Sequence, residues 1–173
     1  MQQASAKPAT SVFDAREFRN ALGTFCTGVT VITTRGPDEP YGMTATSFTS
    51  VSLDPPLVLV CVISGTLGSD TISQNGVFAV NILSHQQEPL SRYFASRDRP
   101  RGADAFKEVA HRNGVTESPI LEGAAAHVDC RVVQSFDVGD HIIFIGEVVA
   151  LEFDPEVPPL LFHGGRYRHV KDD

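Results

Sequence analysis

The chain has 173 residues, enough for one domain with a sizeable core, and its net charge is -7. Hydrophobic residues make up 42% and charged residues 20% of the chain, as in a globular protein, and the long uncharged runs contain proline, glycine and hydroxyl residues that argue against a membrane span. The negative charge argues against a nucleic acid partner, because contacts with phosphates dominate that affinity.

The first predicted element is an N-terminal helix. Residues 1–11 contain no apolar segment typical of a signal peptide, so we expect a disordered tail, a cytoplasmic protein and one domain over residues 12–170. Asp14 and Glu17 have the spacing of a helix capping box. Apolar residues follow at helical intervals, at Phe18, Ala21, Leu22 and Phe25. These features predict an amphipathic helix over residues 14–26 that lies across a sheet.

Strand signals dominate the next section of the chain. Residues 28–34 (GVTVITT) predict a strand, Gly36-Pro37-Asp38 a turn, and the segment from Tyr41 a second strand of the same hairpin. A proline break at residues 54–56 precedes a buried strand over residues 57–63. A short helix fits residues 69–75, closed by Gly76, and a strand follows in VFAVNIL.

The second half begins with a predicted helix and ends in strands. Ser84 and Gln87 predict a capped helix that runs to about residue 95. Residues 96–105, which include Arg97, Arg99 and Arg101, are rich in charge and chain breakers and predict a mobile loop of the kind that covers sites. Three strands follow, over residues 126–136, 141–153 and 160–167. Many strands with short turns and few helices indicate an antiparallel barrel rather than a doubly wound sheet, and barrel closure would leave no open edge.

An unusual hydroxyl-rich stretch stands out in this pattern. TATSFTSVS, at residues 44–52, has six hydroxyl residues among nine and no charge, and its two faces do not separate into apolar and polar. Such a strand either lies at an edge facing water or faces a polar ligand.

Several common site motifs are absent from the sequence. It contains no G-x-G-x-x-G, no G-x-x-x-x-G-K, no H-E-x-x-H, no paired C-x-x-C and no G-x-S-x-G. We therefore expect no metal site, no Gly-rich dinucleotide turn and no simple serine hydrolase. The three cysteines, Cys26, Cys61 and Cys130, are interpreted as reduced and structural.

Five segments, in order between residues 13 and 167, resemble the short-chain flavin reductases of two-component monooxygenases. They are FRNALGTFCTGVTVIT, YGMTATSFTSVSLDPPLVLVCV, FAVNIL, GDHIIFIGEVVAL and PLLFHGGRYR. The resemblance implies a mainly β fold, the FMN-binding split β-barrel, antiparallel and Greek-key-like with a few flanking helices. It implies reduction of FMN or FAD by NADH or NADPH through hydride transfer, and delivery of reduced flavin to a separate flavin-dependent monooxygenase. It also implies a homodimer.

The same resemblance assigns the flavin contacts. Gly42, Met43, Thr44, Thr46 and Ser47 would line the ribityl chain and ring, because small hydroxyls meet a flavin's polar edge without crowding it. The backbone of Cys61, Val62 and Ile63 would add contacts from the next strand. For the phosphate, the candidates are Thr66, Ser69 and Arg92, the last near Phe94 on the following helix.

The nicotinamide side would be formed by two further segments. His141 would lie near the nicotinamide, with Asp140 orienting its ring. The segment from His163 to Tyr167 contains Gly164 and Gly165, which would let a ligand approach the backbone, and Arg166, which would pair with nicotinamide phosphates. Many relatives carry a bulkier residue in place of Gly164. The cofactor-binding set thus includes His163, Gly165, Arg166 and Tyr167.

Three alternatives to the reductase stay open at this level. One is a flavin-binding electron carrier or sensor of the same fold without fast NAD(P)H turnover. Another is an interaction module that docks a peptide on a strand edge. The third is a split-barrel oxidase of pyridoxamine phosphate, which we disfavour because the hydroxyl stretch has no basic residues to hold a second phosphate.

Overall fold

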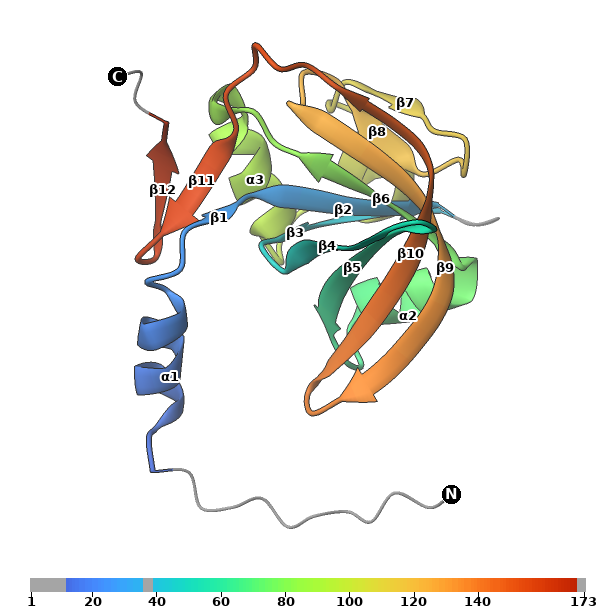
Figure 1. The fold of residues 1–173 in the computed structure, drawn as a ribbon. Coiled ribbons are helices and arrows are strands. Elements are labelled where there is room, and N and C mark those ends of the chain that lie inside the picture. The colour runs from blue at the N-terminus through green and yellow to red at the C-terminus, as the bar shows by residue number, and fades with distance from the viewer. Residues whose placement is uncertain (1–11, 36–38, 171–173) are drawn as a thin grey trace, which may run out of the picture.

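The computed structural model describes residues 12–35 and 39–170, and its body is one strongly curved antiparallel sheet (Figure 1). The strand order in this seven-stranded sheet is β3-β2-β6-β9-β10-β5-β4. The strands are β2 (Thr30–Arg35), β3 (Pro40–Ala45), β4 (Phe48–Leu53), β5 (Pro56–Ile63), β6 (Val77–Ile82), β9 (Ala126–Val138) and β10 (His141–Phe153). The predicted mainly β, antiparallel barrel is confirmed, and so is the β2–β3 hairpin. Its predicted turn at Gly36-Pro37-Asp38, like the predicted tail over residues 1–11, lies outside the described residues.

The two edges of this sheet, β3 and β4, are consecutive in the sequence. A bend at Thr46 and Ser47 joins them, so the hydroxyl-rich stretch is not the single strand we expected. Ser47 ties the bend to β5, because the Cys61 N–H donates to the Ser47 carbonyl at 3.2 Å and the Ser47 hydroxyl donates to the Cys61 carbonyl at 2.7 Å. The two edge strands of the barrel are therefore joined by a continuous stretch of chain. Among the described residues no ladder joins β3 to β4, and in this sense the barrel is split.

Two small sheets flank the barrel. One contains β1 (Thr27–Gly28), β11 (Leu160–His163) and β12 (Arg166–His169), and the other β7 (His111–Asn113) and β8 (Pro119–Leu121). The prediction of one strand over residues 160–167 is wrong, because Gly164 and Gly165 form a two-residue turn between β11 and β12. Both glycines have positive φ, 59° and 73°, as a tight hairpin turn requires.

Three segments pack beside β3. The helix α2 (Leu67–Asn75) begins after Thr66, two residues earlier than predicted, and ends at Gly76 with φ 67°. The helix α3 (Glu88–Ala95) follows the short η1 (His85–Gln87), with the predicted capping box of Ser84 and Gln87. The predicted mobile loop is tied down in part. It contains the start of η2 (Gly102–Phe106), and Arg99 in it donates hydrogen bonds to the carbonyls of Gly42 and Ser96.

The core has two clusters of buried apolar side chains. The first fills the barrel around Phe78 and Phe144, which are both fully buried. The second lies under α3 and η2 around Phe94 and Phe106, whose ring centroids are 5.3 Å apart. Each buried phenylalanine contributes roughly 2 to 3 kcal/mol to the free energy of unfolding. Together the clusters hold β3 and α3 at fixed positions on either side of the bend.

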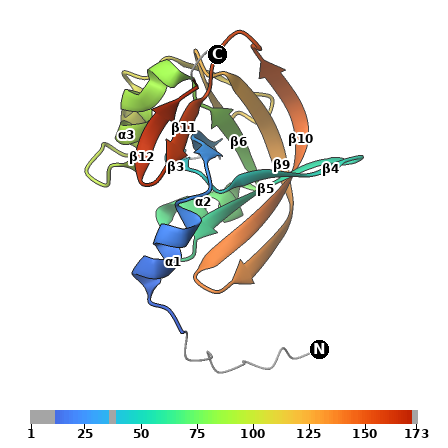
Figure 2. The same cartoon turned by 60° about the vertical axis from the view of Figure 1, so that its left-hand side comes forward.

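The first helix, α1 (Ala15–Leu22), departs from the prediction in its surroundings. Its capping box forms as expected, with Asp14 accepting from the Glu17 N–H at 2.7 Å. It ends at Leu22 instead of residue 26, and it projects from the barrel instead of lying across a sheet (Figures 1 and 2). Phe18 stays 49% exposed and Leu22 58% exposed, because the described part of this chain places no sheet against them.

Candidate functional site

The largest cavity that touches the hydroxyl-rich bend has a volume of about 580 Å³. It lies where β3, β5, the start of β10, α3 and the β11–β12 hairpin meet. Its lining residues are Val29, Tyr41, Met43, Thr44, Ala45, Thr46, Ser47, Cys61, Val62, Ile63, Thr66, Ser91, Ala95, Arg97, His141, Phe162 and Tyr167. This volume falls within the range of about 300 to 1,000 Å³ typical of small-molecule sites.

One wall of the cavity is made of small hydroxyl side chains on β3 and the bend. Thr44 donates to the Ser91 carbonyl at 2.6 Å, and Ser47 donates to the Cys61 carbonyl, so the rotamers of both are held. Their oxygen lone pairs remain able to accept a hydrogen bond from a ligand. The exposed Thr46 hydroxyl makes no hydrogen bond with any residue the structure describes, and it can both donate and accept. This wall therefore suits a ligand with alternating donors and acceptors along one side.

The adjoining wall comes from the end of β5. Cys61 is half-buried and burial raises the pKa of its thiol, so this side chain is a neutral, weakly polar surface. The Val62 side chain points into the core, whereas Ile63 is 54% exposed and presents an apolar surface beside His141, its partner across the ladder. Met43 and Phe162 add further apolar surface. Apolar side chains and small hydroxyls thus line the same cavity.

His141 stands at the first position of β10 and is held by its neighbour. The Asp140 carboxylate accepts a hydrogen bond from Nδ1 of His141 at 2.7 Å, and this hydrogen bond lowers the pKa of Asp140. With Nδ1 occupied, Nε2 is the ring nitrogen available to a ligand. The Gly139-Asp140 turn and the strand start thus produce the arrangement predicted from the sequence, with the imidazole at the cavity wall.

The β11–β12 hairpin brings Tyr167 to the cavity. The Tyr167 hydroxyl lies 2.9 Å from the hydroxyl of Ser91, which is fully buried, so the ring position is fixed by α3. His163, Gly165 and Arg166 are exposed at the turn of this hairpin and do not line the cavity. The cofactor contacts predicted for these three residues therefore fall outside this cavity, because the two glycines form a turn between two strands.

Other predicted contacts also differ in the structure. Phe94 is 1% exposed and belongs to the core, and Gly42 is buried against it, since a Cβ at Gly42 would come 2.7 Å from the Phe94 ring. Gly42 therefore allows close packing against Phe94, and it does not line the cavity of about 580 Å³. Ser69 is fully buried and donates to the Thr66 carbonyl at 2.9 Å, so it stabilises the cap of α2 and does not reach the cavity.

The positively charged side chain at the cavity is not the one we predicted. Arg92 pairs with Glu88 at 2.7 Å on the exposed side of α3 and lies over the outer face of Tyr167, with 4.7 Å from its guanidinium carbon to the ring centroid. Arg97, which follows α3, lines the cavity instead, with Thr66. Ser91 and Phe162 also line the cavity, although the sequence pattern does not predict them. The only sequence signal for Arg97 was its place in the charged loop.

The described residues provide neither a cluster of metal ligands nor a helix that could span a membrane. Within residues 12–35 and 39–170, no group of three histidine, cysteine or acidic side chains is placed to hold a metal ion. None of the helices in the same ranges is both long and apolar enough to cross a membrane.

Comparison with known proteins gives consistent matches over most of the chain. A family model described as "Flavin reductase like domain" matches residues 22–171. An NADH-dependent FAD reductase of Streptomyces globisporus is 43% identical over 161 residues, covering 92% of this chain and 88% of that protein. The reductase subunit HsaB of a flavin-dependent monooxygenase from Rhodococcus jostii is 39% identical, covering 95% of this chain and 83% of the subunit.

Solved structures agree with the sequence matches. The Streptomyces globisporus NADH:FAD oxidoreductase SgcE6, in complex with NAD and FAD fragments, superposes with a TM-score of 0.86 at 41% identity over 92% of this chain and 94% of its own. BorF, the flavin reductase component of a bacterial two-component tryptophan halogenase, superposes with a TM-score of 0.87 at 38% identity over 92% of this chain and 100% of its own.

Proposed function

We propose, from the premise that this chain belongs to the flavin reductase like domain family, that it is an NAD(P)H:flavin oxidoreductase. It reduces FMN or FAD with a reduced nicotinamide, NADH in the relatives whose names state the donor, and supplies the reduced flavin to a separate flavin-dependent monooxygenase. The observation that carries this proposal is the cavity of about 580 Å³, with its hydroxyl wall on β3 and its apolar wall from β5 and the hairpin.

The residues of this cavity fit a flavin. A flavin has an apolar ring body, a polar pyrimidine edge, a ribityl chain of hydroxyls and a phosphate. Met43, Ile63 and Phe162 offer apolar surface to the ring, and the hydroxyl wall offers hydrogen-bonding partners to the ribityl chain and polar edge. Thr66 and Arg97 offer a donor and a positive charge to the phosphate. Bound flavin would supply the redox chemistry, by accepting a hydride from the nicotinamide.

The protein's own contribution is binding and alignment. His141, oriented by Asp140, can hydrogen-bond through Nε2 to a group in the cavity, and we assign it to the nicotinamide carboxamide. Tyr167, fixed by Ser91, limits how a second ring can stack in the site. No acid or base is required for hydride transfer itself.

We also infer a homodimer and a single domain over residues 12–170. The support for the homodimer is the amphipathic helix α1, whose Phe18 and Leu22 are about half exposed, together with the exposed Phe25 that follows it. A second copy of the chain would remove this apolar face from water.

The direct test is oxidation of NADH and of NADPH by the purified protein, followed by loss of nicotinamide absorbance, with FMN, FAD or no flavin added. Oxidation that depends on added flavin is the expected result, and the rates give both preferences. Flavin binding without oxidation would instead identify an electron carrier or sensor. Absence of both binding and oxidation would overturn the proposal.

A second experiment tests the role of His141. His141→Ala should lower kcat/KM for NADH about tenfold, which corresponds to the loss of one hydrogen bond of about 1.4 kcal/mol. Asp140→Asn keeps the imidazole and should have a smaller effect. His163→Ala removes an exposed histidine outside the cavity and is the matched control. Equal rates for the His141 and His163 variants would remove His141 from the site.

A further inference from the structure

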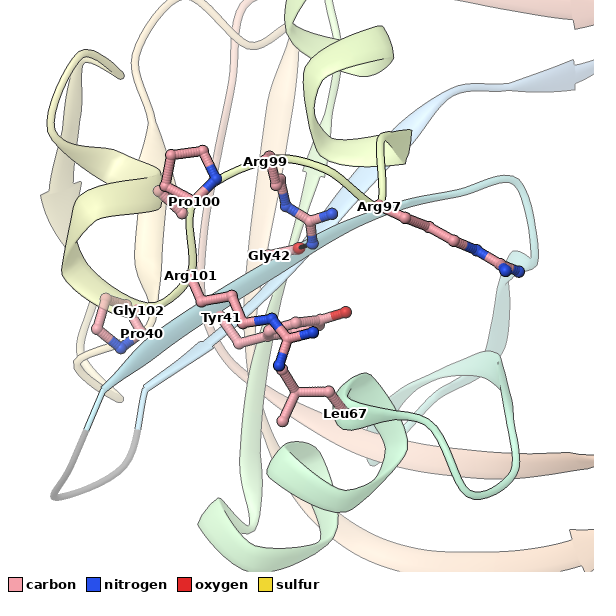
Figure 3. A pocket seen from close by; sticks show the side chains of 10 residues that line it. Pro40, Tyr41, Gly42, Leu67, Arg97, Arg99, Pro100, Arg101 and Gly102 are labelled. Carbon is pink, nitrogen blue, oxygen red and sulfur yellow. Dashed lines mark hydrogen bonds between the residues drawn. The ribbon is translucent and has the colours of Figure 1, made fainter.

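A second cavity of about 210 Å³ adjoins the first, between β3, the start of α2 and the loop that follows α3. We name it the arginine pocket, with Pro40, Tyr41, Leu67, Arg97, Pro100 and Arg101 among its lining residues (Figure 3). Tyr41 and Arg97 line both cavities, so the two are direct neighbours. Thr66 and Leu67, adjacent in the sequence, contribute one to each cavity, and the N-terminus of α2 therefore lies at the seam.

The three arginines near this pocket have different surroundings. Arg99 is a structural residue, because it donates to the carbonyls of Gly42 and Ser96 and lies over the Tyr41 ring, 5.5 Å from its centroid. Arg97 and Arg101 are exposed and form no hydrogen bond or ion pair with any residue in the described ranges. In Figure 3, Arg101 extends across Tyr41 toward Leu67, whereas Arg97 reaches away from it.

The charge and the shape of the arginine pocket indicate which kind of ligand it can bind. Two arginines that pair with none of the described residues, in a chain with a net charge of -7, favour an anion at this place. Two acidic groups lie near this place: the Glu39 carboxylate is close to Gly102 at the margin of the pocket, and Asp70 is in the first turn of α2. The Tyr41 ring, Leu67 and two prolines form an apolar floor beside the guanidinium groups. Planar guanidinium and aromatic surfaces stack with nucleobases, and guanidinium groups pair with phosphates.

We propose that the arginine pocket binds the adenosine monophosphate half of FAD and makes this chain prefer FAD to FMN. The inference rests on the proposed function, which places the flavin phosphate at Thr66 and Arg97. In FAD the second phosphate and the adenosine continue from that phosphate, and the arginine pocket begins at the same two positions, at Leu67 and at Arg97 itself. The first-turn N–H groups of α2 and Arg97 receive the diphosphate, and Arg101 and Tyr41 receive the adenosine.

The test compares flavin preference in the full chain and in a variant of the pocket. KM for FAD should be at least about tenfold below KM for FMN at saturating NADH. Arg101→Ala should raise KM for FAD about tenfold more than it raises KM for FMN, and Arg101→Lys should give an intermediate value because it keeps the charge and loses the planar group. Arg168→Ala, which removes an exposed arginine of β12 outside both cavities, is the control and should not change the ratio.

The other outcomes distinguish a failure of this inference from a failure of the proposed function. Equal KM values for FAD and FMN in the unmodified chain, or an unchanged ratio in Arg101→Ala, would overturn the inference. A rise in KM for NADH or NADPH alone would also overturn it and would assign the pocket to the adenosine end of the nicotinamide. If no flavin supports oxidation, the proposed function fails. Equilibrium binding of FAD and FMN, measured by flavin fluorescence for the same variants, then still tests the arginine pocket. Circular dichroism confirms that each variant is folded.

Discussion

The helices α1 and α3 have the same length and nearly the same local signals, and yet they meet opposite surroundings. Each is preceded by a capping box, Asp14 with Glu17 for α1 and Ser84 with Gln87 for the η1–α3 unit, and each has an apolar face. No residue of α1 is buried, whereas α3 buries Ser91 and Phe94. The contrast teaches that capping and periodicity determine where a helix forms, but the partner of its apolar face is set by what the rest of the chain places beside it.

The contrast also has a functional side. Because α3 is buried, its Ser91 can hold Thr44 and Tyr167 in position at the cavity. The exposed α1 is tied to the β11–β12 turn only at its C-cap, where the Gly23 carbonyl accepts from the Gly164 N–H at 2.8 Å; none of the residues of α1 is buried, and its apolar face stays exposed in the described part of this chain.

The largest effect is expected in the reactivity of two cysteines, one buried in the barrel core and one exposed after α1. Burial raises the pKa of Cys130, on β9 in the barrel core, to about 12, against 9.0 for an ordinary thiol. At about pH 8 the thiolate fraction of Cys130 is therefore about a thousandfold below that of an ordinary thiol. Iodoacetamide labelling of native protein, followed by mass spectrometry, should modify the exposed Cys26 after α1 and leave Cys130 unmodified until denaturant is added. Equal labelling of both would contradict the described burial.

Phenylalanine removal gives the next largest effect. Phe94→Ala leaves a cavity beside Phe106 and Tyr93 and should lower the free energy of unfolding by about 3 to 5 kcal/mol. Phe18→Ala, its counterpart on α1, should change it by less than about 0.5 kcal/mol in dilute, monomeric protein. Urea denaturation measures both. A comparable loss for the two variants at low protein concentration would show that α1 packs on its own barrel.

A charge on α1 tests what covers its apolar face. Phe18→Asp should weaken self-association at least about tenfold, or about 1.4 kcal/mol, because the carboxylate would have to be desolvated at the interface. Asn20→Asp adds the same charge about 200° further round the helix, and it should leave association unchanged. Sedimentation velocity over a range of concentrations measures both. A protein that is monomeric throughout would refute the inferred homodimer.

The smallest effect is expected at the caps. Gln87 accepts from the Ser84 N–H at 3.0 Å and donates to the Glu122 carbonyl at 2.8 Å, so Gln87→Ala should cost about 1 kcal/mol of global stability. Glu17 makes the equivalent bond to the Asp14 N–H at 2.9 Å, but Glu17→Ala should fray α1 without moving the unfolding midpoint. Urea unfolding followed by circular dichroism distinguishes these results. Equal shifts of the midpoint would show that α1 and α3 are coupled to the core in the same way.

Much of the fold was predictable because the turn signals are local. The Gly139-Asp140 turn separates β9 from β10, and β10 begins and ends where the alternation of the sequence predicts. The hairpin β11–β12 was missed because Gly164-Gly165 was interpreted as a ligand contact. The break between β3 and β4 was missed because Thr46 and Ser47 are as compatible with a strand as with a bend, and only the curvature of the whole sheet decides between them.

The candidate site was predictable to a similar degree. Thr44, Thr46, Ser47 and His141 do line one cavity, since their residue types carry hydrogen-bonding capacity that a strand interior does not need. The choice between Arg92 and Arg97 was not available from the sequence. Both follow or lie on the same helix, and which one faces the cavity depends on the pairing of Arg92 with Glu88 and on the path of the loop after α3.

Sequence patterns alone predicted most strands of the large sheet, the capped helices, the hydroxyl residues of the cavity and, through resemblance, the family, because these depend on side-chain type and on spacing along a few turns or strands. They did not predict β7 and β8. The tertiary structure alone decided that the hydroxyl stretch bends where the sheet edges meet, that Gly42 packs on Phe94, that α1 is left uncovered, and that Arg97 and Arg101 lie beside the flavin cavity. These facts depend on contacts between residues far apart in the chain, and local propensity does not encode which distant surfaces meet.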